Sequence, residues 1–142
     1  MKKQLDFAKD LDLPVSLHSR DAKDITKDVF DNYKEIKGVM HCFSYDTETA
    51  KYYLDKGLFL GVGGTSTYKS NREVREALKV IPLDRILLET DAPYLTPDPY
   101  RRNINNSSYI EYVIKFLSDL KGVSEEEIIT QTNKNAYELF KF

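Results

Sequence analysis

The sequence predicts an α/β fold of four parallel strands with flanking helices. Four short apolar runs recur along the 142 residues, and their first residues are 25, 20 and 27 positions apart. Helical hydrophobic patterns fill the intervals, and because β-α-β connections are right-handed, successive strands should be parallel. The length suits one domain, so we expect residues 1–142 to fold as a unit. Two architectures fit this order, an open doubly wound sheet and part of a (β/α)8 barrel.

The four runs have the character of strands that are buried on both faces. They are six to eight residues long, rich in Leu and β-branched residues, and each ends in small or polar residues. They are Leu13–Arg20, Gly38–Phe43, Leu58–Gly64 and Arg85–Asp91. A complete barrel needs eight strands and typically about 250 residues, so this chain would supply half of one.

Six segments with helical patterns lie before, between and after these runs. One apolar stripe, formed by Ile25, Val29, Phe30 and Tyr33, has the three- and four-residue spacing of a helix that runs from Asp21 to about Ile36. The other predicted helices are Gln4–Leu11, Thr47–Lys56, Arg72–Ile81, Ser107–Lys121 and a last one from Ser124 to about Phe140.

Glycines and capping residues mark several helix ends. Gly57 and Gly122 directly follow two of the predicted helices, where a glycine commonly ends a helix. Asn71 is placed to cap the helix that follows it, and Ser124 with Glu127 has the pattern of a capping box.

The composition is that of a folded protein with balanced charge. The formal net charge is −2, with 21 Lys and Arg against 23 Asp and Glu, which excludes a broad basic surface for nucleic acid and makes any phosphate binding local. No apolar run approaches the roughly 20 residues of a membrane span, so we expect no membrane partner. The single cysteine, Cys42, excludes an internal disulfide and is expected to be a small core residue. Since no apolar leader is visible, these features predict a cytoplasmic protein.

The polar residues that end the four runs are candidates for a functional site, because in both architectures ligands bind at the carboxyl ends of the strands. His18 and His41 are the two histidines of the sequence, and each follows three or four apolar or small residues of its strand. Glu89 and Asp91 end the fourth run, and the two-residue period of a strand would place them on one face.

Imidazole and carboxylate groups at neighbouring strand ends can bind a divalent cation. A single histidine at such a place more often satisfies a hydrogen bond in the core. Two histidines at matched strand ends, with Asp91 at a third, instead favour a metal site made of His18, His41 and Asp91. Glu89 is a fourth candidate ligand, because a buried pair of carboxylates without a cation would be costly.

Three further features allow two interpretations each. Gly61–Gly64 either exposes main-chain N–H groups to a phosphate or relieves crowding at the end of its strand. Lys69 either meets an anionic substrate or lies in a solvated loop. Arg101 and Arg102, which follow a proline-rich turn, either clamp a substrate phosphate or lie on the surface.

Four motifs in the strand-end segments carry a resemblance to a known family. They begin at His18, Gly38, Leu60 and Leu87 and read HSRDA, GVMHCFS, LGVGGT and LLETDAPYLT. In this order and spacing they resemble the motifs of the TatD family of metal-dependent deoxyribonucleases. The resemblance extends over nearly the whole chain, from about residue 4 to residue 140.

This resemblance implies a (β/α)8 barrel of the amidohydrolase-like group that binds two or three divalent cations, which would be Mg²⁺, Mn²⁺ or Zn²⁺, and hydrolyses phosphodiester bonds in DNA. The four strands would then be strands five to eight, the carboxyl-terminal half of the barrel. By the same resemblance, His18, His41 and Asp91 are metal ligands. Asp91 also accepts the proton of the attacking water, and Glu89 helps to hold the metal site.

The sequence departs from the family pattern at three places. It contains neither the His-x-His of the first barrel strand nor the metal-bridging Glu of the fourth, and we expect a partner half to carry these ligands. Tyr45 stands where the family has a glycine after Phe-Ser. In the family's Arg-Gly-Lys-Arg-Asn stretch, Arg101 and Asn105 match, while Ile104 occupies the place of the second arginine.

A half-barrel leaves main-chain groups unpaired along its first and last strands and one sheet face without the side chains that would fill the barrel. Each unpaired buried group costs about 1–3 kcal/mol, against a net stability of about 5–15 kcal/mol. We therefore expect a homodimer or a complementary amino-terminal half-barrel polypeptide as partner. The family resemblance implies DNA as substrate. Because the four candidate ligands hardly suffice for two cations, the isolated chain should bind one cation weakly and cleave DNA poorly. The alternatives are a non-catalytic half-barrel assembly module and a metal-dependent hydrolase of another ester or phosphoester.

Overall fold

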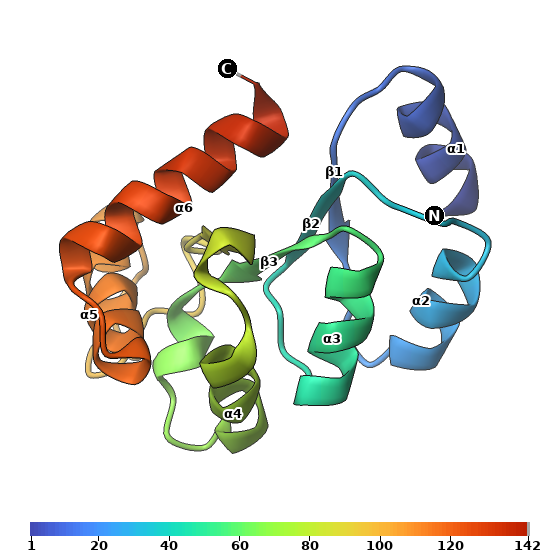
Figure 1. Ribbon diagram of the computed structural model, residues 1–142. Coiled ribbons are helices and arrows are strands. Elements are labelled where there is room, and N and C mark those ends of the chain that lie inside the picture. The colour runs from blue at the N-terminus through green and yellow to red at the C-terminus, as the bar shows by residue number, and fades with distance from the viewer. Residues whose placement is uncertain (142) are drawn as a thin grey trace.

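The computed structural model describes residues 1–141, in which four central strands are surrounded by six α-helices (Figure 1). The strands are β1 (Val15–His18), β2 (Gly38–His41), β3 (Phe59–Val62) and β4 (Ile86–Leu88). The helices are α1 (Lys2–Asp10), α2 (Lys23–Phe30), α3 (Thr47–Asp55), α4 (Arg72–Val80), α5 (Ile110–Lys121) and α6 (Glu125–Phe140). Each lies where the sequence predicts a strand or helix. Over residues 1–141, no helix is both long and apolar enough to cross a membrane.

The four strands form one parallel sheet in the order β1-β2-β3-β4. Strands β1 and β2 pair so that Val15 lies opposite Gly38 and His18 lies opposite His41. Strand β3 pairs in parallel with β2 on one side and with β4 on the other. The predicted sheet of four parallel strands is thus confirmed, and within the described residues its edges are β1 and β4.

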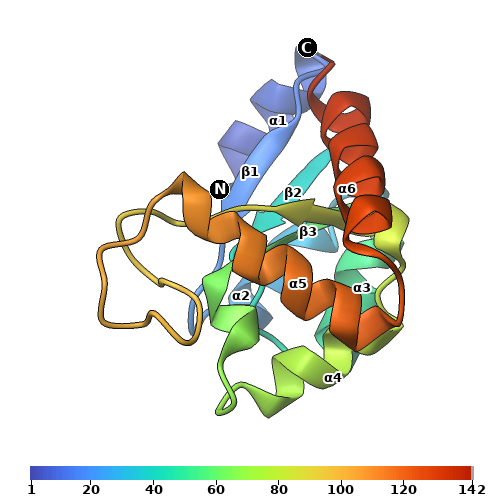
Figure 2. The same ribbon diagram turned by 90° about the vertical axis from the view of Figure 1, so that its left-hand side faces the viewer.

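The two faces of the sheet pack against different cores. One face belongs to the main core, to which all six helices contribute, and its buried members from the four strands are Leu17, Met40, Leu60, Val62 and Ile86. The other face forms a smaller cluster with α6, made of Val39, Phe59, Leu87 and Leu139. In Figure 1 the helices follow one another around the strands, with α1 and α2 on the right of the view, α3 beside α4 below the sheet, and α5 and α6 on the left. Figure 2, which faces that left side, shows α5 and α6 in front of the strands.

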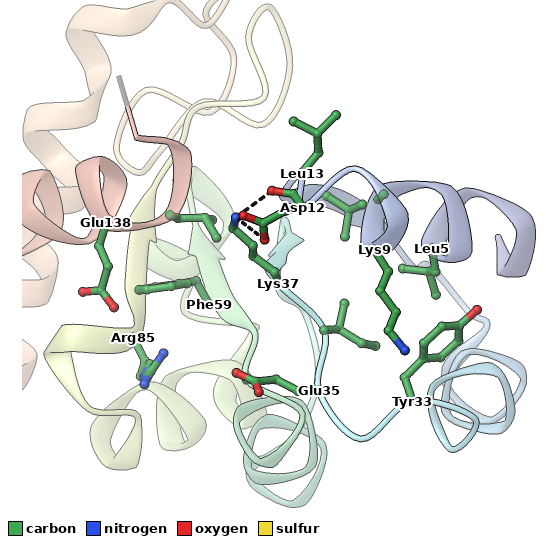
Figure 3. A pocket seen from close by; sticks show the side chains of 15 residues that line it. Leu5, Lys9, Asp12, Leu13, Tyr33, Glu35, Lys37, Phe59, Arg85 and Glu138 are labelled. Atoms are coloured by element: carbon green, nitrogen blue, oxygen red, sulfur yellow. Dashed lines mark hydrogen bonds and ion pairs between the residues drawn. The ribbon is translucent and has the colours of Figure 1, made fainter.

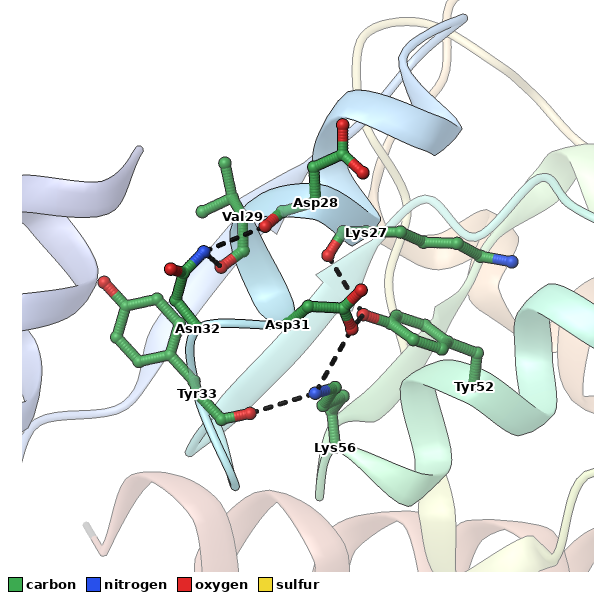
Figure 4. A network of polar contacts seen from close by, with 8 residues as sticks. All are labelled: Lys27, Asp28, Val29, Asp31, Asn32, Tyr33, Tyr52 and Lys56. Carbon is green, nitrogen blue, oxygen red and sulfur yellow. Dashed lines mark hydrogen bonds and ion pairs between the residues drawn. The ribbon is translucent and has the colours of Figure 1, made fainter.

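Helix α2 ends earlier than predicted, at Phe30 and not near Ile36. The side chain of Asn32 donates to two main-chain carbonyls in the last part of α2, at 2.9 and 3.1 Å, and so satisfies acceptors that a longer helix would have used (Figure 4). The predicted apolar stripe is also wrong at one position, because Ile25 is 72% exposed.

A polar network ties the end of α2 to α3 (Figure 4). The Tyr52 hydroxyl lies 2.6 Å from Asp31 Oδ1 and 3.1 Å from the carbonyl oxygen of Lys27. Lys56 Nζ donates to the carbonyl oxygen of Tyr33 at 3.0 Å and lies 3.5 Å from Asp31 Oδ1. Burial, together with the Asp31 carboxylate, raises the pKa of Tyr52. These contacts hold the two helices beside each other on the flank of β1 and β2.

Three of the four predicted helix-end residues act as predicted. Gly57 and Gly122 have positive φ angles of 84° and 68°, and Ser124 Oγ accepts a hydrogen bond from the first turn of α6 at 3.1 Å. Asn71 does not cap α4. Its side chain instead donates to the carbonyl oxygen of Thr65 at 2.9 Å, which ties the start of α4 to the turn after β3.

A cavity of about 490 Å³ opens at the amino-terminal ends of the strands (Figure 3). Among its lining residues, Lys37 Nζ donates to the main-chain and side-chain oxygens of Asp12 at 2.7 and 3.0 Å. The Arg85 guanidinium lies 5.2 Å from the ring centre of Phe59. This cavity lies at the opposite end of the sheet from the two histidines, so it is separate from the site predicted at the strand ends.

Candidate functional site

One histidine and two carboxylates meet where β2 and β4 end. His41 is the last residue of β2, and Glu89 and Asp91 follow the last residue of β4. His41 Nδ1 lies 2.5 Å from Glu89 Oε2, and His41 Nε2 lies 3.3 Å from Asp91 Oδ1. The imidazole therefore lies between the two carboxylates that the sequence indicates.

Glycines on β3 and directly after it make this contact possible, because β3 lies between β2 and β4 in the sheet. A Cβ atom on Gly63 would collide with the Glu89 carboxylate, and one on Gly61 would lie 3.3 Å from the Cα atom of His41. His41, Gly61 and Glu89 line one cavity of about 400 Å³. Because Gly61 and Gly63 have no side chains, His41 and Glu89 can approach each other across the end of β3.

The next glycine, Gly64, lies beneath the loop that follows β4. A Cβ atom there would collide with the carbonyl oxygen of Leu95 and would lie 2.9 Å from the nitrogen of Pro97. All four residues of Gly61–Gly64 are buried. Of the two interpretations that the sequence allowed for these glycines, the relief of crowding at the strand end is the one that the packing favours.

His18 lies beside His41 but apart from the carboxylates. The two histidines are opposite each other in the β1–β2 pairing, with ring centres 5.9 Å apart and ring planes inclined by 40°. His18 is exposed, and within residues 1–141 its side chain forms no hydrogen bond or ion pair. A ligand that approaches the strand ends would therefore find this imidazole free.

Glu89 is a buried carboxylate with little compensation. Its side chain is 17% exposed, and apart from the close approach of His41 Nδ1 neither oxygen has a polar partner among the described residues. Burial raises the pKa of Glu89, the nearby His41 opposes this rise, and the Asp91 carboxylate adds to it. A positive charge at this place would therefore be stabilising.

Asp91 reaches His41 from outside the strand. Strand β4 ends at Leu88, so the two-residue period expected to align Glu89 with Asp91 does not extend to them. Asp91 has a φ angle of 56°, and Cys42, next to His41, has a φ angle of 49°, both in the left-handed region that few non-glycine residues adopt. Burial and the two nearby carboxylates raise the pKa of the half-buried Cys42 thiol to about 11, which keeps it protonated and unreactive.

The predicted phosphate-binding residues lie on the surface and outside this cluster. Lys69, Arg101 and Arg102 are all exposed. The Arg101 guanidinium lies 3.8 Å from the ring centre of Tyr68, and Tyr68 directly precedes Lys69 in the sequence. Tyr68 is buried, and its hydroxyl donates to the carbonyl oxygen of Thr96 at 2.9 Å. Arg101 therefore rests on a fixed aromatic side chain, whereas Arg102 forms no contact of this kind within residues 1–141.

The structure adds Asn105, whose residue type and position alone did not indicate a site residue. Asn105 is 3% exposed, and its side-chain amide donates to the carbonyl oxygens of Thr90 and Tyr94 at 2.7 and 2.6 Å. Its main-chain N–H donates to the carbonyl oxygen of Pro93 at 3.0 Å. In the sequence, these acceptors lie on both sides of Asp91, one before it and two after it. The match of Asn105 to the family stretch was the one signal in the sequence that could have indicated it.

The donor chemistry of the cluster fits a divalent cation. It offers imidazole nitrogens, carboxylate oxygens and, in Glu89, buried acceptor atoms without hydrogen bonds from the described residues. The donors do not form a closed ligand set, because among residues 1–141 no three His, Cys, Asp or Glu side chains are placed to hold a metal ion together. His41 turns its two nitrogens to different carboxylates, and binding would require it to release one of them.

Comparisons with known proteins agree on one family. The sequence profile of the family described as TatD related DNase matches residues 1–141. The uncharacterized metal-dependent hydrolase YabD of Bacillus subtilis (strain 168) is 39% identical over 145 residues, which cover 99% of this chain and 56% of YabD. The uncharacterized metal-dependent hydrolase YcfH of Escherichia coli (strain K12) is 37% identical over 138 residues, which cover 96% of this chain and 52% of YcfH.

A solved structure extends the agreement to the fold. The crystal structure of YjjV, a TatD homolog from Escherichia coli K12, matches with a TM-score of 0.91 at 33% identity, over 99% of this chain and 54% of that one. Fold and site together define an α/β protein with a histidine–carboxylate cluster at the carboxyl ends of parallel strands. The chain belongs to the TatD related DNase family, as its motifs predict. It spans about half the length of the relatives that it matches.

Proposed function

We propose that this chain is the carboxyl-terminal half of a (β/α)8 barrel that hydrolyses phosphodiester bonds in DNA with the help of a divalent cation. The observation that carries the proposal is the position of His41 between Glu89 and Asp91 at the carboxyl ends of the strands. Membership of the TatD related DNase family supports DNA as the substrate. The names of YabD and YcfH, both metal-dependent hydrolases, support the need for a metal.

His18, His41 and Asp91 are the residues that would hold the cation, with Glu89 as a fourth ligand or as a support beneath it. When bound, the cation supplies a Lewis acid that lowers the pKa of water and polarises the phosphoryl group. The mixture of imidazole and carboxylate donors suits Mn²⁺ or Zn²⁺ better than Mg²⁺, which prefers oxygen ligands.

Asp91 is the group that accepts the proton of the attacking water. Its side chain is 37% exposed, about twice the exposed fraction of Glu89, so water can reach its oxygens. His41 Nε2 lies 3.3 Å from Asp91 Oδ1 and limits how far the carboxylate can turn. The buried Glu89 carboxylate lies at the other nitrogen of the same ring, Nδ1.

Binding of the DNA phosphates falls to Lys69, Arg101 and Arg102. In a chain of net charge −2, a local cluster of cations is the form that phosphate binding has to take. The contact of Arg101 with the buried Tyr68 holds its guanidinium in place beside the loop that bears Lys69.

The half-barrel requires a partner, and we expect a polypeptide that supplies the complementary amino-terminal half. Support comes from the share of YabD, YcfH and YjjV that the chain covers, which is 56%, 52% and 54%. Strand β4 is an edge of the described sheet, so its outer main-chain groups have no strand partner among the described residues. A second copy of the chain, related by a two-fold axis, is the alternative partner.

A nuclease assay with matched variants tests the proposed function. With Mn²⁺ or Zn²⁺, we expect weak cleavage of a DNA oligonucleotide by the chain alone and stronger cleavage after co-expression with the part of YabD that this chain does not match. Asp91→Asn and His41→Ala should abolish the cleavage, because each removes a proposed ligand. Asp119→Asn, which changes an exposed aspartate on α5, is the control and should have no effect.

Other results would point to the alternatives. Cleavage that survives Asp91→Asn would contradict the proposed site. Hydrolysis of small phosphoesters or carboxylic esters without cleavage of DNA would indicate a hydrolase with another substrate. Association with the YabD part without metal binding or hydrolysis would indicate a non-catalytic assembly module. Light scattering on the purified chain distinguishes the two partners, because a stable dimer of the chain alone would favour the second copy.

A further inference from the structure

The loop that carries Asp91 has few contacts of its own. Residues 89–94 follow β4 without helix or strand structure. The Tyr94 N–H donates to the carbonyl oxygen of Asp91 at 3.0 Å, and the Ala92 N–H donates to Thr90 Oγ1 at a long 3.3 Å. Asp91 also has a φ angle of 56°, in the left-handed region, where a non-glycine residue costs free energy that contacts with its surroundings can offset.

Asn105 supplies contacts of this kind. The two hydrogens of its side-chain amide go to the carbonyl oxygens of Thr90 and Tyr94, on either side of Asp91, at 2.7 and 2.6 Å. Its main-chain N–H binds the carbonyl oxygen of Pro93 at 3.0 Å. The Asn105 Oδ1 atom is buried and has no hydrogen-bond partner among the described residues, so the contacts of this side chain with the loop are made by its donors.

We infer that Asn105 is a positioning residue that fixes the loop of Asp91 and thereby holds the Asp91 carboxylate at the candidate cation site. A single amide nitrogen can donate to two carbonyl oxygens at once and carries no charge into a buried place, whereas a carboxylate has no donor and a hydroxyl has one. The inference rests on the proposed function for the role of Asp91, while the contacts of Asn105 with the loop are independent of it. Asn105 itself lies beneath the loop and needs no contact with cation or substrate.

The chain contains a matched control in Asn135, on α6. Asn135 is also buried, at 0% exposed, and its side-chain amide also donates to two main-chain carbonyl oxygens, those of Leu83 and Ile86, at 2.9 and 2.8 Å. These acceptors lie at the start of β4, at the opposite end of the strand from Asp91. Removal of either side-chain amide removes two comparable hydrogen bonds. Only removal of the Asn105 amide takes hydrogen bonds away from the loop that carries Asp91.

The experiment compares Mn²⁺ binding to the unsubstituted chain and to the Asp91→Asn, Asn105→Ala and Asn135→Ala variants, measured by the electron paramagnetic resonance signal of free Mn²⁺. Substitutions of outer residues that orient ligands typically weaken metal binding 10–100-fold. We expect Asn105→Ala to weaken Mn²⁺ binding at least about tenfold and Asn135→Ala less than about twofold. Equal effects of the two variants would overturn the inference.

Hydrogen exchange separates this inference from the proposed function. If the unsubstituted chain binds Mn²⁺ no better than Asp91→Asn, the proposed site is wrong. The inference is then judged by exchange at the Tyr94 amide, which Asn105→Ala should accelerate at least about tenfold while Asn135→Ala leaves it unchanged. Unaltered exchange at Tyr94 would overturn the inference. If Asn105→Ala does not fold, Asn105→Ser, which keeps one donor, is judged by the same two measurements.

Discussion

Replacement of Glu89 by glutamine should have opposite effects on stability and on cation binding. The Glu89 side chain is 17% exposed, and both of its oxygens lack hydrogen bonds from the described residues. A buried polar group without a partner costs about 1–3 kcal/mol, and more when it is charged. Glutamine keeps the shape and removes the charge, so Glu89→Gln should raise the free energy of unfolding of the cation-free chain by about 1 kcal/mol.

The same substitution should reduce the stabilisation that a cation provides. For a chain of this length, about 1 kcal/mol corresponds to about 3 °C in Tm. A cation at a hundred times its Kd adds about 2.7 kcal/mol to the stability of the protein that binds it. Thermal unfolding of the unsubstituted chain should therefore shift upward with Mn²⁺, and Glu89→Gln should start higher and shift by less than half as much.

A matched substitution controls for the loss of a negative charge. Glu138→Gln changes an exposed glutamate on α6 and should alter neither the Tm without Mn²⁺ nor the shift with it. A Glu89→Gln variant that is less stable than the unsubstituted chain would mean that the Glu89 carboxylate is already satisfied without a cation. A variant that keeps the full shift with Mn²⁺ would mean that Glu89 does not contribute to cation binding.

Three further substitutions probe the packing. Gly64→Ala should cost about 1–3 kcal/mol in urea unfolding, because its Cβ would collide with the main-chain carbonyl of Leu95; unchanged stability would show that the loop yields freely. Lys121→Met should cost about 1–3 kcal/mol in the same assay, because Lys121 Nζ donates to two main-chain carbonyls at the end of α4 at 2.6 Å each, and a neutral result would contradict this. Burial and the Asp6 carboxylate raise the pKa of Tyr33 to about 12, so its contribution to stability is complete below pH 10 and is lost as the pH rises toward 12. Tyr33→Phe should therefore lose less stability over that interval than the unsubstituted chain, and equal losses would exclude the assignment.

The apolar runs predicted the strands because β2, β3 and β4 are buried on both faces over most of their length. The expected burial of both faces is wrong for the edge strand β1, where Ser16 and His18 are exposed. Strand β2 begins at Gly38, as predicted, and carries His41 as its last residue. The predicted runs were longer than the strands, since their polar ends had left the sheet. The difference affects the site at β4, because Glu89 and Asp91 lie in the loop beyond Leu88. Tertiary contacts determine their positions, and the two-residue period of a strand cannot predict such contacts.

The contact between His41 and Glu89 depends on the order of strands in the sheet. His41 ends β2 and Glu89 directly follows β4, and they meet because Gly61 on β3 and Gly63 just after it have no side chains. From the sequence alone these glycines had two interpretations, and the packing of the sheet distinguishes between them. The support of Asp91 by Asn105 is likewise a tertiary contact across a long loop, which local patterns do not report.

Local hydrogen bonds explain the errors at helix ends. The periodic pattern after Phe30 continued to favour a helix, but the Asn32 side chain takes two of the carbonyls that the helix would need. Asn71 has the right residue type for a cap and is instead bound to Thr65 in the preceding turn. In both cases an asparagine amide has several possible partners, and the surrounding structure determines which one it binds.

The central claim is that His18, His41 and Asp91 bind a divalent cation, and crystals soaked in ZnCl₂ test it most directly by anomalous diffraction at the zinc absorption edge. The account predicts one peak about 2.0–2.2 Å from nitrogen or oxygen atoms of these three side chains, and its loss in His41→Ala. Density for zinc elsewhere on the molecule, with none beside His41 and Asp91, would contradict it.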